Sequence, residues 1–430
     1  MKGCSAGKSG HDAISNLLIA LGCMVYFSSY VMRYSYTVSM ANIVSVTALT
    51  ETQAGVIGTA LFFSYGVGQI LSGILGDKLK PNLIILTGII VGSACNFIFP
   101  LYNSVVYYAA VWAVNGFAQA MLWPPLVRIF SDRLSPEKCT AGIVAVAVTA
   151  NAATVALYLI IPLILNGPGW KSVFLYSGIF AAVSGVLWCA GYGLASKKLN
   201  RDKSYDAAEE PARNDKKTKL WPVLSGCGMI FILLAIVCQG FLRDGVTGWF
   251  PSYVSDTFSI PSSDGILMTA VLSAAAIISI YLMKWIYRRF CKNEVRISLM
   301  CFAAAAALSV LLFVFYSGSV VLSVSCSALI VALSHGINLM LISYIPTHFA
   351  KLGIASTVSG ITNACTYLGS GLSSYLFALV AQLIGWRYVI LFWALISVFG
   401  AVVCAAAYRP WKKFTLKGVE SPRQDDSGRE

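Results

Sequence analysis

The chain has 430 residues, of which 57% are hydrophobic and only 11% are charged. This composition excludes a soluble domain with a polar surface and indicates a protein that lies within a lipid bilayer. The formal net charge of +13 does not indicate nucleic-acid binding, because no basic patch lies on a soluble domain.

Apolar runs of about 20 residues predict twelve transmembrane helices and therefore an all-α integral membrane fold. The first run carries no charge before Arg33. We interpret it as a retained helix, because no A-x-A-like cleavage site follows it. In chain order, the predicted helices span 14–36, 54–75, 82–102, 105–129, 140–165, 171–195, 222–254, 264–287, 295–316, 319–345, 354–383 and 386–408.

Positive charges are distributed unevenly between the two sets of loops. If the N-terminus is cytoplasmic, 27 of the 31 lysines and arginines fall on the cytoplasmic side, and only Lys171 and Arg387 fall outside. The remaining two, Arg33 and Arg243, lie within predicted helices. Because cytoplasmic loops carry the excess of lysine and arginine, we predict a multi-pass protein of the plasma or inner membrane with both termini in the cytoplasm.

One long polar stretch, residues 196–221, divides the chain into two halves. We predict an N-terminal six-helix bundle over 1–195 and a C-terminal six-helix bundle over 222–410. The stretch between them is predicted to be a cytoplasmic linker, and residues 411–430 a cytoplasmic tail.

The two halves also repeat one another in sequence. The motif "GWKSV", which begins at Gly169, recurs as "GWRYV" 216 residues later, and Arg33 is followed by Arg243 after 210 residues. Matches at nearly one period predict a duplicated, pseudo-symmetric pair of bundles with a central site between them.

Arg33 and Arg243 are predicted to face this central site from equivalent helices. Keeping an arginine at membrane depth costs on the order of 3 kcal/mol, which a partner or a watery cavity usually offsets. We expect no acidic partner, because the neighbouring Asp244 leaves its helix about 100° away from Arg243. Two guanidinium groups facing one cavity favour a phosphate-like oxyanion. The alternative is that each side chain extends to the outer membrane interface.

The fourth helix and the loop after it carry a specific motif, "NGFAQAMLWPPLVRIFSDRLSPEKCTAGIVAV", residues 115–146. It resembles the signature of the organophosphate:phosphate antiporters of the major facilitator superfamily, the glycerol-3-phosphate and hexose-phosphate transporters. The loop with Asp77 and Lys78 resembles that family's G-x-x-x-D-[RK] loop. The segments "YFSSYVMR", "FLRDGVTGWFPSY" and "YLGSG" extend the resemblance over nearly the whole chain.

The resemblance implies a secondary active transporter that works by alternating access. It would exchange a small organophosphate, such as a phosphorylated sugar or glycerol, for phosphate. The family's two phosphate-binding arginines match Arg33 and Arg243. The candidate substrate-binding residues are Arg33, Arg243, Tyr26, Tyr30, Tyr65, Gln69, Gln119, Asn151, His335 and Tyr367. The candidate gating residues are Asp77, Lys78 and Arg128, because Asp77 would contact Arg128 or a helix end of the other half in one state only.

Several positions depart from the family pattern. Gln69 replaces a lysine and Asn151 replaces a histidine, so the site favours a less charged ligand or binds phosphate more weakly. His335 replaces a tyrosine, and could be either a protonated cation or a neutral, hydrogen-bonded side chain. Asp244 is an added acid that could couple transport to protons. A proton-coupled symporter of a sugar-like or carboxylate substrate is therefore an alternative.

The sequence contains no set of residues that would indicate an enzyme. No nucleophile lies near a base, and the 12 cysteines show neither a C-x-x-C pair nor metal-like spacing with the three histidines. We therefore expect no cofactor and no metal. The expected partners are a small anionic substrate and the lipid bilayer, with no nucleic acid and no second copy. A membrane sensor built on a transporter fold is a further alternative.

Overall fold

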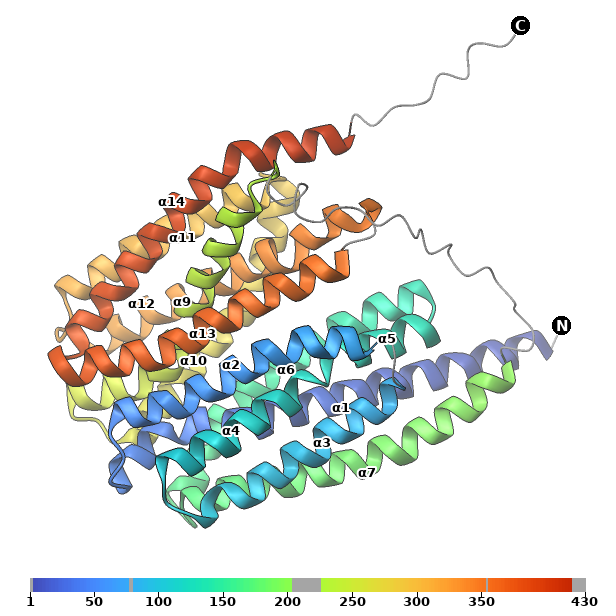
Figure 1. Cartoon of the computed structure of the whole chain (residues 1–430), viewed down its shortest axis with the longest axis horizontal. Coiled ribbons are helices and arrows are strands. Elements are labelled where there is room, and N and C mark those ends of the chain that lie inside the picture. Colours follow the sequence, from blue (N-terminus) through green and yellow to red (C-terminus); the bar gives the residue numbers. More distant parts are fainter. Residues whose placement is uncertain (1–2, 77–79, 203–225, 353–354, 420–430) are drawn as a thin grey trace, which may run out of the picture.

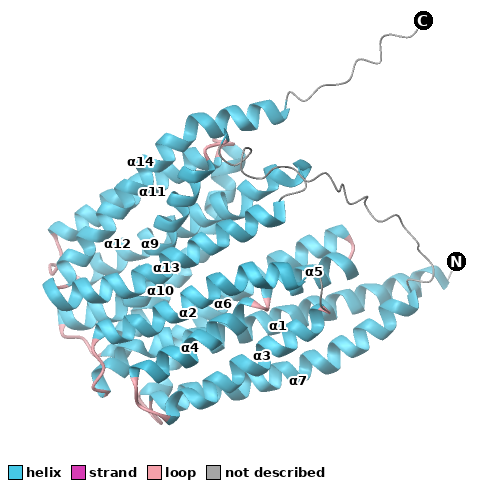
Figure 2. Ribbon diagram, in the orientation of Figure 1, coloured by secondary structure: helices cyan, strands magenta, loops and turns pink. Residues whose placement is uncertain are grey.

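The computed structural model describes residues 3–76, 80–202, 226–352 and 355–419. Every secondary-structure element in these residues is helical (Figures 1 and 2). They include 12 helices that are long and apolar enough to cross a membrane, with spans of 21 to 35 residues. The predicted all-α fold with twelve transmembrane helices is confirmed.

Helices satisfy their own backbone hydrogen bonds, as a chain surrounded by lipid requires. In chain order, they are α1 (Gly3–Val46), α2 (Glu51–Gly76), α3 (Pro81–Ile98), η1 (Phe99–Leu101), α4 (Val105–Ala120), α5 (Trp123–Arg133), α6 (Pro136–Leu165), α7 (Trp170–Asp202), α9 (Met229–Phe258), α10 (Ser262–Arg289), α11 (Glu294–Val314), α12 (Val320–Asn338), η2 (Leu339–Tyr344), η3 (Ile345–Leu352), α13 (Ala355–Ile384) and α14 (Trp386–Val419). The local sequence determines where several of these helices begin. Pro81 opens α3, and the Ser135 side chain caps α6 by accepting a hydrogen bond from the backbone N–H of Lys138.

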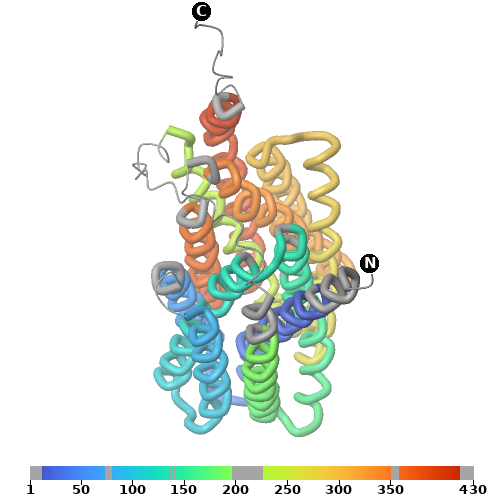
Figure 3. The backbone as a smooth tube through the Cα atoms, turned by 90° about the vertical axis from the view of Figure 1, so that its right-hand side faces the viewer, coloured from blue at the N-terminus to red at the C-terminus, as the bar shows by residue number. Residues whose placement is uncertain are grey.

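The helices form two bundles, α1–α7 and α9–α14, which lie side by side in two perpendicular views (Figures 1 and 3). The repeated Gly-Trp motif has the same backbone in both. Gly169 (φ +89°) precedes α7, and Gly385 (φ +93°) precedes α14. Each glycine donates its N–H to the carbonyl five residues earlier, that of Ile164 or Val380. Glycine adopts this left-handed conformation without strain. The duplication predicted from the sequence is therefore present in the backbone.

The predicted fourth helix, over 105–129, is interrupted in the structure between α4 and α5. Pro124 has no backbone N–H and cannot donate to the carbonyl of Ala120, four residues earlier. The side-chain amide of Gln69, on α2, donates to that carbonyl over 3.4 Å. The interruption thus follows from the proline pair, and Gln69 partly replaces the missing hydrogen bond.

The predicted tenth helix, over 319–345, is also irregular. It begins as α12, continues as a π-helix (η2) and ends as a 3-10 helix (η3). Pro346 lies in η3, 222 residues beyond Pro124. The two bundles therefore interrupt the same helix at the same level. Irregular backbone at membrane depth is tolerated where it is buried in protein or lines a cavity.

Two helices extend past the predicted domain bounds. α7 continues to Asp202, inside the predicted linker over 196–221. α14 continues to Val419, inside the predicted tail over 411–430. The remaining parts of the linker and the tail lie outside the described residues, so the domain bounds stay predictions.

The two bundles touch along α2 and α13 at the far end of the molecule, away from the terminal end where α1 begins and α14 ends (Figure 1). We call this contact the α2–α13 seam. It consists of Thr52, Gly55, Gly58 and Thr59 on α2 and Gly371, Ser374 and Gln382 on α13. The Thr59 hydroxyl donates to the carbonyl of Gly371 over 2.7 Å. A Cβ atom at Gly55 would collide with the carbonyl of Ser374, so the missing side chain lets the helices approach closely.

Candidate substrate-binding site

A cavity lies between the two bundles and has two adjoining parts. The inner chamber has a volume of about 60 Å³, and the outer chamber a volume of about 420 Å³. Both are lined by Tyr30, Asn151, Arg243, His335 and Tyr367. Side chains from α1, α2 and α6 meet side chains from α9, α10, α12 and α13 in the inner chamber. The site is therefore assembled from both halves of the chain.

The outer chamber extends from the inner one toward the terminal end. Its lining includes Gln69, Trp123 and Pro346, which lie where α2, α5 and η3 approach that end. The interrupted backbone thus borders a cavity, at Trp123 in the first bundle and at Pro346 in the second. At the opposite end the α2–α13 seam joins the bundles. The structure therefore has one closed end and one end toward which the cavity extends.

Arg33, on α1, is only 4% exposed. Its guanidinium carbon lies 4.5 Å from the centroid of the Tyr30 ring, 5.5 Å from that of Tyr34 and 5.1 Å from that of Tyr65. Ring faces stabilise the cation but accept its N–H groups poorly. Accordingly, Nε and Nη1 find no hydrogen-bond acceptor among the described residues. The alternative that Arg33 extends to the membrane interface is wrong, because the guanidinium is buried among rings beside the inner chamber.

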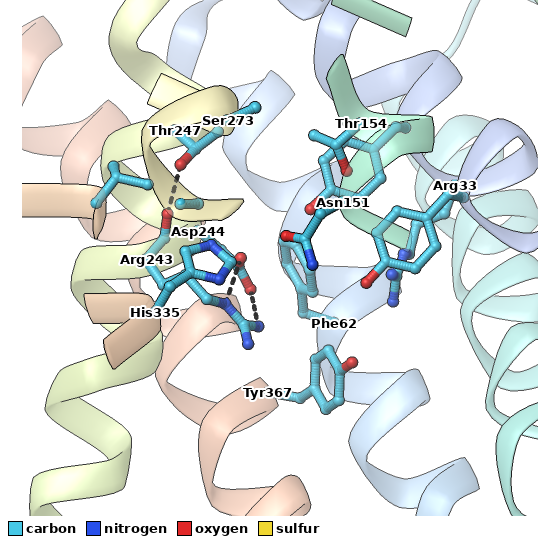
Figure 4. A pocket seen from close by; sticks show the side chains of 14 residues that line it. Arg33, Phe62, Asn151, Thr154, Arg243, Asp244, Thr247, Ser273, His335 and Tyr367 are labelled. Atoms are coloured by element: carbon cyan, nitrogen blue, oxygen red, sulfur yellow. Dashed lines mark hydrogen bonds and ion pairs between the residues drawn. The ribbon is translucent and has the colours of Figure 1, made fainter. Parts of the chain in front are cut away.

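Arg243, on α9, contradicts the prediction that it lacks an acidic partner. Its Nε donates to Oδ1 of Asp244 over 2.8 Å, and its Nη2 donates to Oδ2 over 2.6 Å. The Ser370 hydroxyl, on α13, donates to the same Oδ2 over 2.6 Å. The angle of about 100° separates only the Cβ atoms of adjacent helical residues, and the long arginine side chain bends back to the adjacent carboxylate. Figure 4 shows this pair facing Arg33 across the chamber, with Asn151 and Tyr367 between them in this view.

The four predicted tyrosines all line the cavity, at different depths. Tyr30 and Tyr367 border both chambers, whereas Tyr26 and Tyr65 border the outer one. The rings of Tyr65 and Tyr367, from opposite bundles, have centroids 4.2 Å apart. The Tyr26 ring lies 5.1 Å from that of Trp123. The tyrosines thus line the route from the outer chamber to Arg33.

Three of the four predicted polar side chains reach the cavity. Asn151 and His335 line both chambers, and Gln69 lines the outer one. Gln119 lines neither, which corrects its assignment as a substrate-binding residue. Its amide nitrogen donates to Oδ1 of Asn115 over 3.1 Å in the buried packing of α4 against α1. A motif shows that a residue matters, but it does not give the helix face that the residue occupies.

The predicted gating residues are described only in part. Asp77 and Lys78 lie outside the described residues, so their contact with a helix of the other half stays a prediction. Arg128, on α5, lies 3.5 Å from Asp132, and both side chains are more than a third exposed. A surface ion pair of this kind contributes about 1 kcal/mol or less.

Some cavity residues were not found from the sequence. Tyr34 follows Arg33 directly, and Thr154 lies one turn beyond Asn151 on α6, so both carried a positional signal. Ser273 lines the inner chamber, and its buried hydroxyl has no partner among the described residues. Ser370, which donates to Asp244, lies within the segment "YLGSG", but that motif does not show which side chain the serine contacts. The described residues contain no group of three or more metal-ligating side chains.

Two helical bundles that build one central cavity define a class of polytopic membrane transporters rather than enzymes. The chain belongs to the Major Facilitator Superfamily, whose family model matches residues 22–374. That match covers helices of both bundles and the predicted site residues.

The relatives of the chain include organophosphate transporters. The chain is 22% identical to a probable hexose phosphate transport protein of Chlamydia muridarum, over 84% of each chain. It is also 22% identical to the glycerol-3-phosphate transporter of Bacillus subtilis, over 86% of this chain and 87% of the relative. Among solved structures, a bacterial homolog of the human lysosomal transporter Spinster, inward-facing and unoccupied, matches with a TM-score of 0.72 at 14% identity, over 93% of this chain and 98% of that one.

Proposed function

We propose that this protein is a secondary active transporter that carries a small organophosphate, such as a phosphorylated glycerol or sugar, by alternating access and in exchange for phosphate. The observation that carries the proposal is the buried Arg33 guanidinium: Arg33 lines the inner chamber, and its Nε and Nη1 have no acceptor among the described residues. A buried cation without a hydrogen-bond acceptor is costly. A ligand oxyanion that supplied two acceptors would remove that cost. The names of the relatives support an organophosphate as the ligand.

The dimensions of the cavity support a small ligand. The outer chamber, of about 420 Å³, is in the range of small-molecule sites, about 300–1,000 Å³. Its polar side chains can hydrogen-bond hydroxyl groups, while the rings of Tyr65 and Tyr367 can pack against a carbon skeleton. The anionic group would lie deepest, at Arg33, and the hydroxyl-bearing part would lie toward the outer chamber.

The packing between the bundles supports alternating access. The α2–α13 seam joins them at the far end, while the cavity extends toward the terminal end. Opening the seam and closing the outer chamber would expose Arg33 to the other side. A ligand that contacts both bundles would favour this exchange by its difference in affinity for the two states.

Uptake into liposomes tests the proposal. Purified protein is reconstituted into vesicles loaded with phosphate, and labelled glycerol 3-phosphate and glucose 6-phosphate are supplied outside. We expect uptake that requires internal phosphate and is lost in Arg33→Gln. Uptake driven by a pH gradient without internal anion would favour the proton-coupled symporter. Binding without any transport would favour a membrane sensor.

We also infer the orientation and a gate from the sequence. The lysine and arginine distribution supports a cytoplasmic terminal end, and a reporter fused at Ser204 that reads as extracellular would contradict this. Asp77 is proposed as a gating residue. Asp77→Asn should slow transport while changing equilibrium ligand affinity by only a few fold, as a shift of about 1 kcal/mol in the conformational equilibrium does. Abolished binding would contradict the gating role.

A further inference from the structure

The two arginines of the cavity do not have equal capacity for a ligand. In Arg33, Nε and Nη1 have no acceptor among the described residues. In Arg243, Nε and Nη2 are both engaged by the carboxylate of Asp244. A guanidinium binds a phosphate through the same bidentate geometry of two parallel hydrogen bonds. Asp244 therefore occupies the place on Arg243 that a phosphoryl group would take.

Asp244 is also held from a second helix. The Ser370 hydroxyl, on α13, donates to the Oδ2 atom that accepts from Arg243. The side chains of Arg243 and Asp244 are 15% and 10% exposed. A largely buried carboxylate with three hydrogen bonds is expensive to displace, because each broken bond must be replaced. The pairing is thus a built feature of the site.

The pairing changes the charge that a ligand meets. Among the described residues, the side chains with formal charges that line the inner chamber are Arg33, Arg243 and Asp244, with His335 counted as neutral. Their sum is one positive charge. In a partly desolvated chamber, a second negative charge on the ligand would face Asp244 without a free cation to balance it.

We propose that Asp244 is a specificity-determining residue that limits the ligand to one negative charge. The preferred ligand is a small monoanion, such as a sulfate ester, a sulfonate or the singly charged form of a phosphate monoester, with its anionic group on Arg33. Doubly charged phosphate monoesters bind more weakly. This inference rests on the proposed anion site at Arg33 and narrows the charge of its ligand.

Two isosteric ligands test the proposal at one pH. Ethyl sulfate carries a single negative charge, whereas ethyl phosphate at pH 8 carries about two. Their affinities for the purified full-length protein are measured by isothermal titration calorimetry. We expect the wild-type protein to bind ethyl sulfate about tenfold or more tightly than ethyl phosphate, since like charges juxtaposed in a binding site are strongly unfavourable.

Asp244→Asn keeps the shape of the side chain and removes its charge. This variant should shift the preference toward ethyl phosphate by about tenfold or more. Asp264→Asn, an exposed acid at the start of α10 and away from the cavity, is the matched control and should leave the preference unchanged. The wild-type comparison needs no variant, so the test survives if Asp244→Asn does not fold.

The outcomes separate this inference from the function on which it rests. Tighter or equal binding of ethyl phosphate by the wild-type protein, or an unchanged preference in folded Asp244→Asn, would overturn the role of Asp244 while leaving the anion site intact. If neither ester binds, the anion site itself is wrong, and the inference is overturned with it.

Discussion

The arginines of the two bundles lie on equivalent helices, α1 and α9, but in different surroundings. Around Arg33 the rings of Tyr30, Tyr34 and Tyr65 leave donors unmatched, whereas Arg243 is matched by a carboxylate. Duplication has thus preserved the position of the arginine but not its hydrogen-bonding state. Because only one of the two is ready to accept an anion, equal substitutions in the two bundles should have unequal effects.

The largest effect is expected at Arg33. Arg33→Lys keeps the charge but loses the planar pair of donors, so it should weaken organophosphate binding by about 1.5–3 kcal/mol, or about 10- to 150-fold. Titration calorimetry measures the change. Arg387→Lys, exposed at the start of α14, is the matched control. An affinity within about twofold of wild type in Arg33→Lys would remove this residue from the site.

A smaller effect on affinity is expected at Arg243. Arg243→Lys should cost about 1 kcal/mol or less in ligand binding, because Nε and Nη2 already serve Asp244. The melting temperature should fall, since the buried carboxylate loses one of its two guanidinium bonds.

The same substitution made in Asp244→Asn sharpens the contrast. The asparagine amide offers one acceptor oxygen in place of two, so a guanidinium donor is freed for the ligand. Arg243→Lys should therefore cost more in affinity there than in the wild-type background, as a double-mutant cycle would show. If Arg243→Lys and Arg33→Lys, each made in the wild-type background, lose equal affinity, then both arginines bind the ligand equally and the asymmetry between them is wrong.

The aromatic ring near Arg33 should contribute more to stability than the ring near Arg243, and this difference should be smaller than the difference in ligand affinity. Tyr30→Leu removes the ring 4.5 Å from Arg33 and should lower stability by about 0.5–1 kcal/mol more than Tyr30→Phe, which keeps the ring. The Tyr367 ring lies farther from its arginine, 5.9 Å from Arg243. The stabilities of Tyr367→Leu and Tyr367→Phe should therefore differ by less. Thermal unfolding of the ligand-free protein measures all four variants. Equal differences in the two bundles would contradict the asymmetry.

The smallest effect is expected at Gln69, at the interrupted helix of the first bundle. Gln69→Leu removes the donor to the carbonyl of Ala120 and should reduce stability by about 0.5 kcal/mol, since the bond is long. Gln69→Lys keeps a donor and serves as the control. A large loss of ligand affinity at unchanged stability would instead make Gln69 a substrate-binding residue.

The parts of the fold that one-dimensional patterns dictate were predictable from the sequence. Apolar runs identified the twelve spans, and the repeated Gly-Trp motif identified a duplication that recurs as matching φ angles at Gly169 and Gly385. The helix interruption at Pro124 was not predicted, because hydropathy does not register a missing N–H. The pairing of Arg243 with Asp244 was missed because it depends on how a flexible side chain bends. Gln119 was misplaced because its orientation is set by buried packing.

A substitution in the α2–α13 seam would trap the protein in the conformation in which the far end is open. At Gly55 and Gly58 the helices approach so closely that Ser374 occupies the space of a methyl group. Alanine at either glycine would push α2 and α13 apart and so open the far end, and its methyl group would not contact the cavity. By contrast, a Cβ atom at Gly66 on the same helix would lie 3.6 Å from that of Tyr367, an ordinary van der Waals contact. We therefore expect Gly55→Ala to hold the protein with its far end open, whereas Gly66→Ala, 11 residues later on α2, should leave the conformation unchanged.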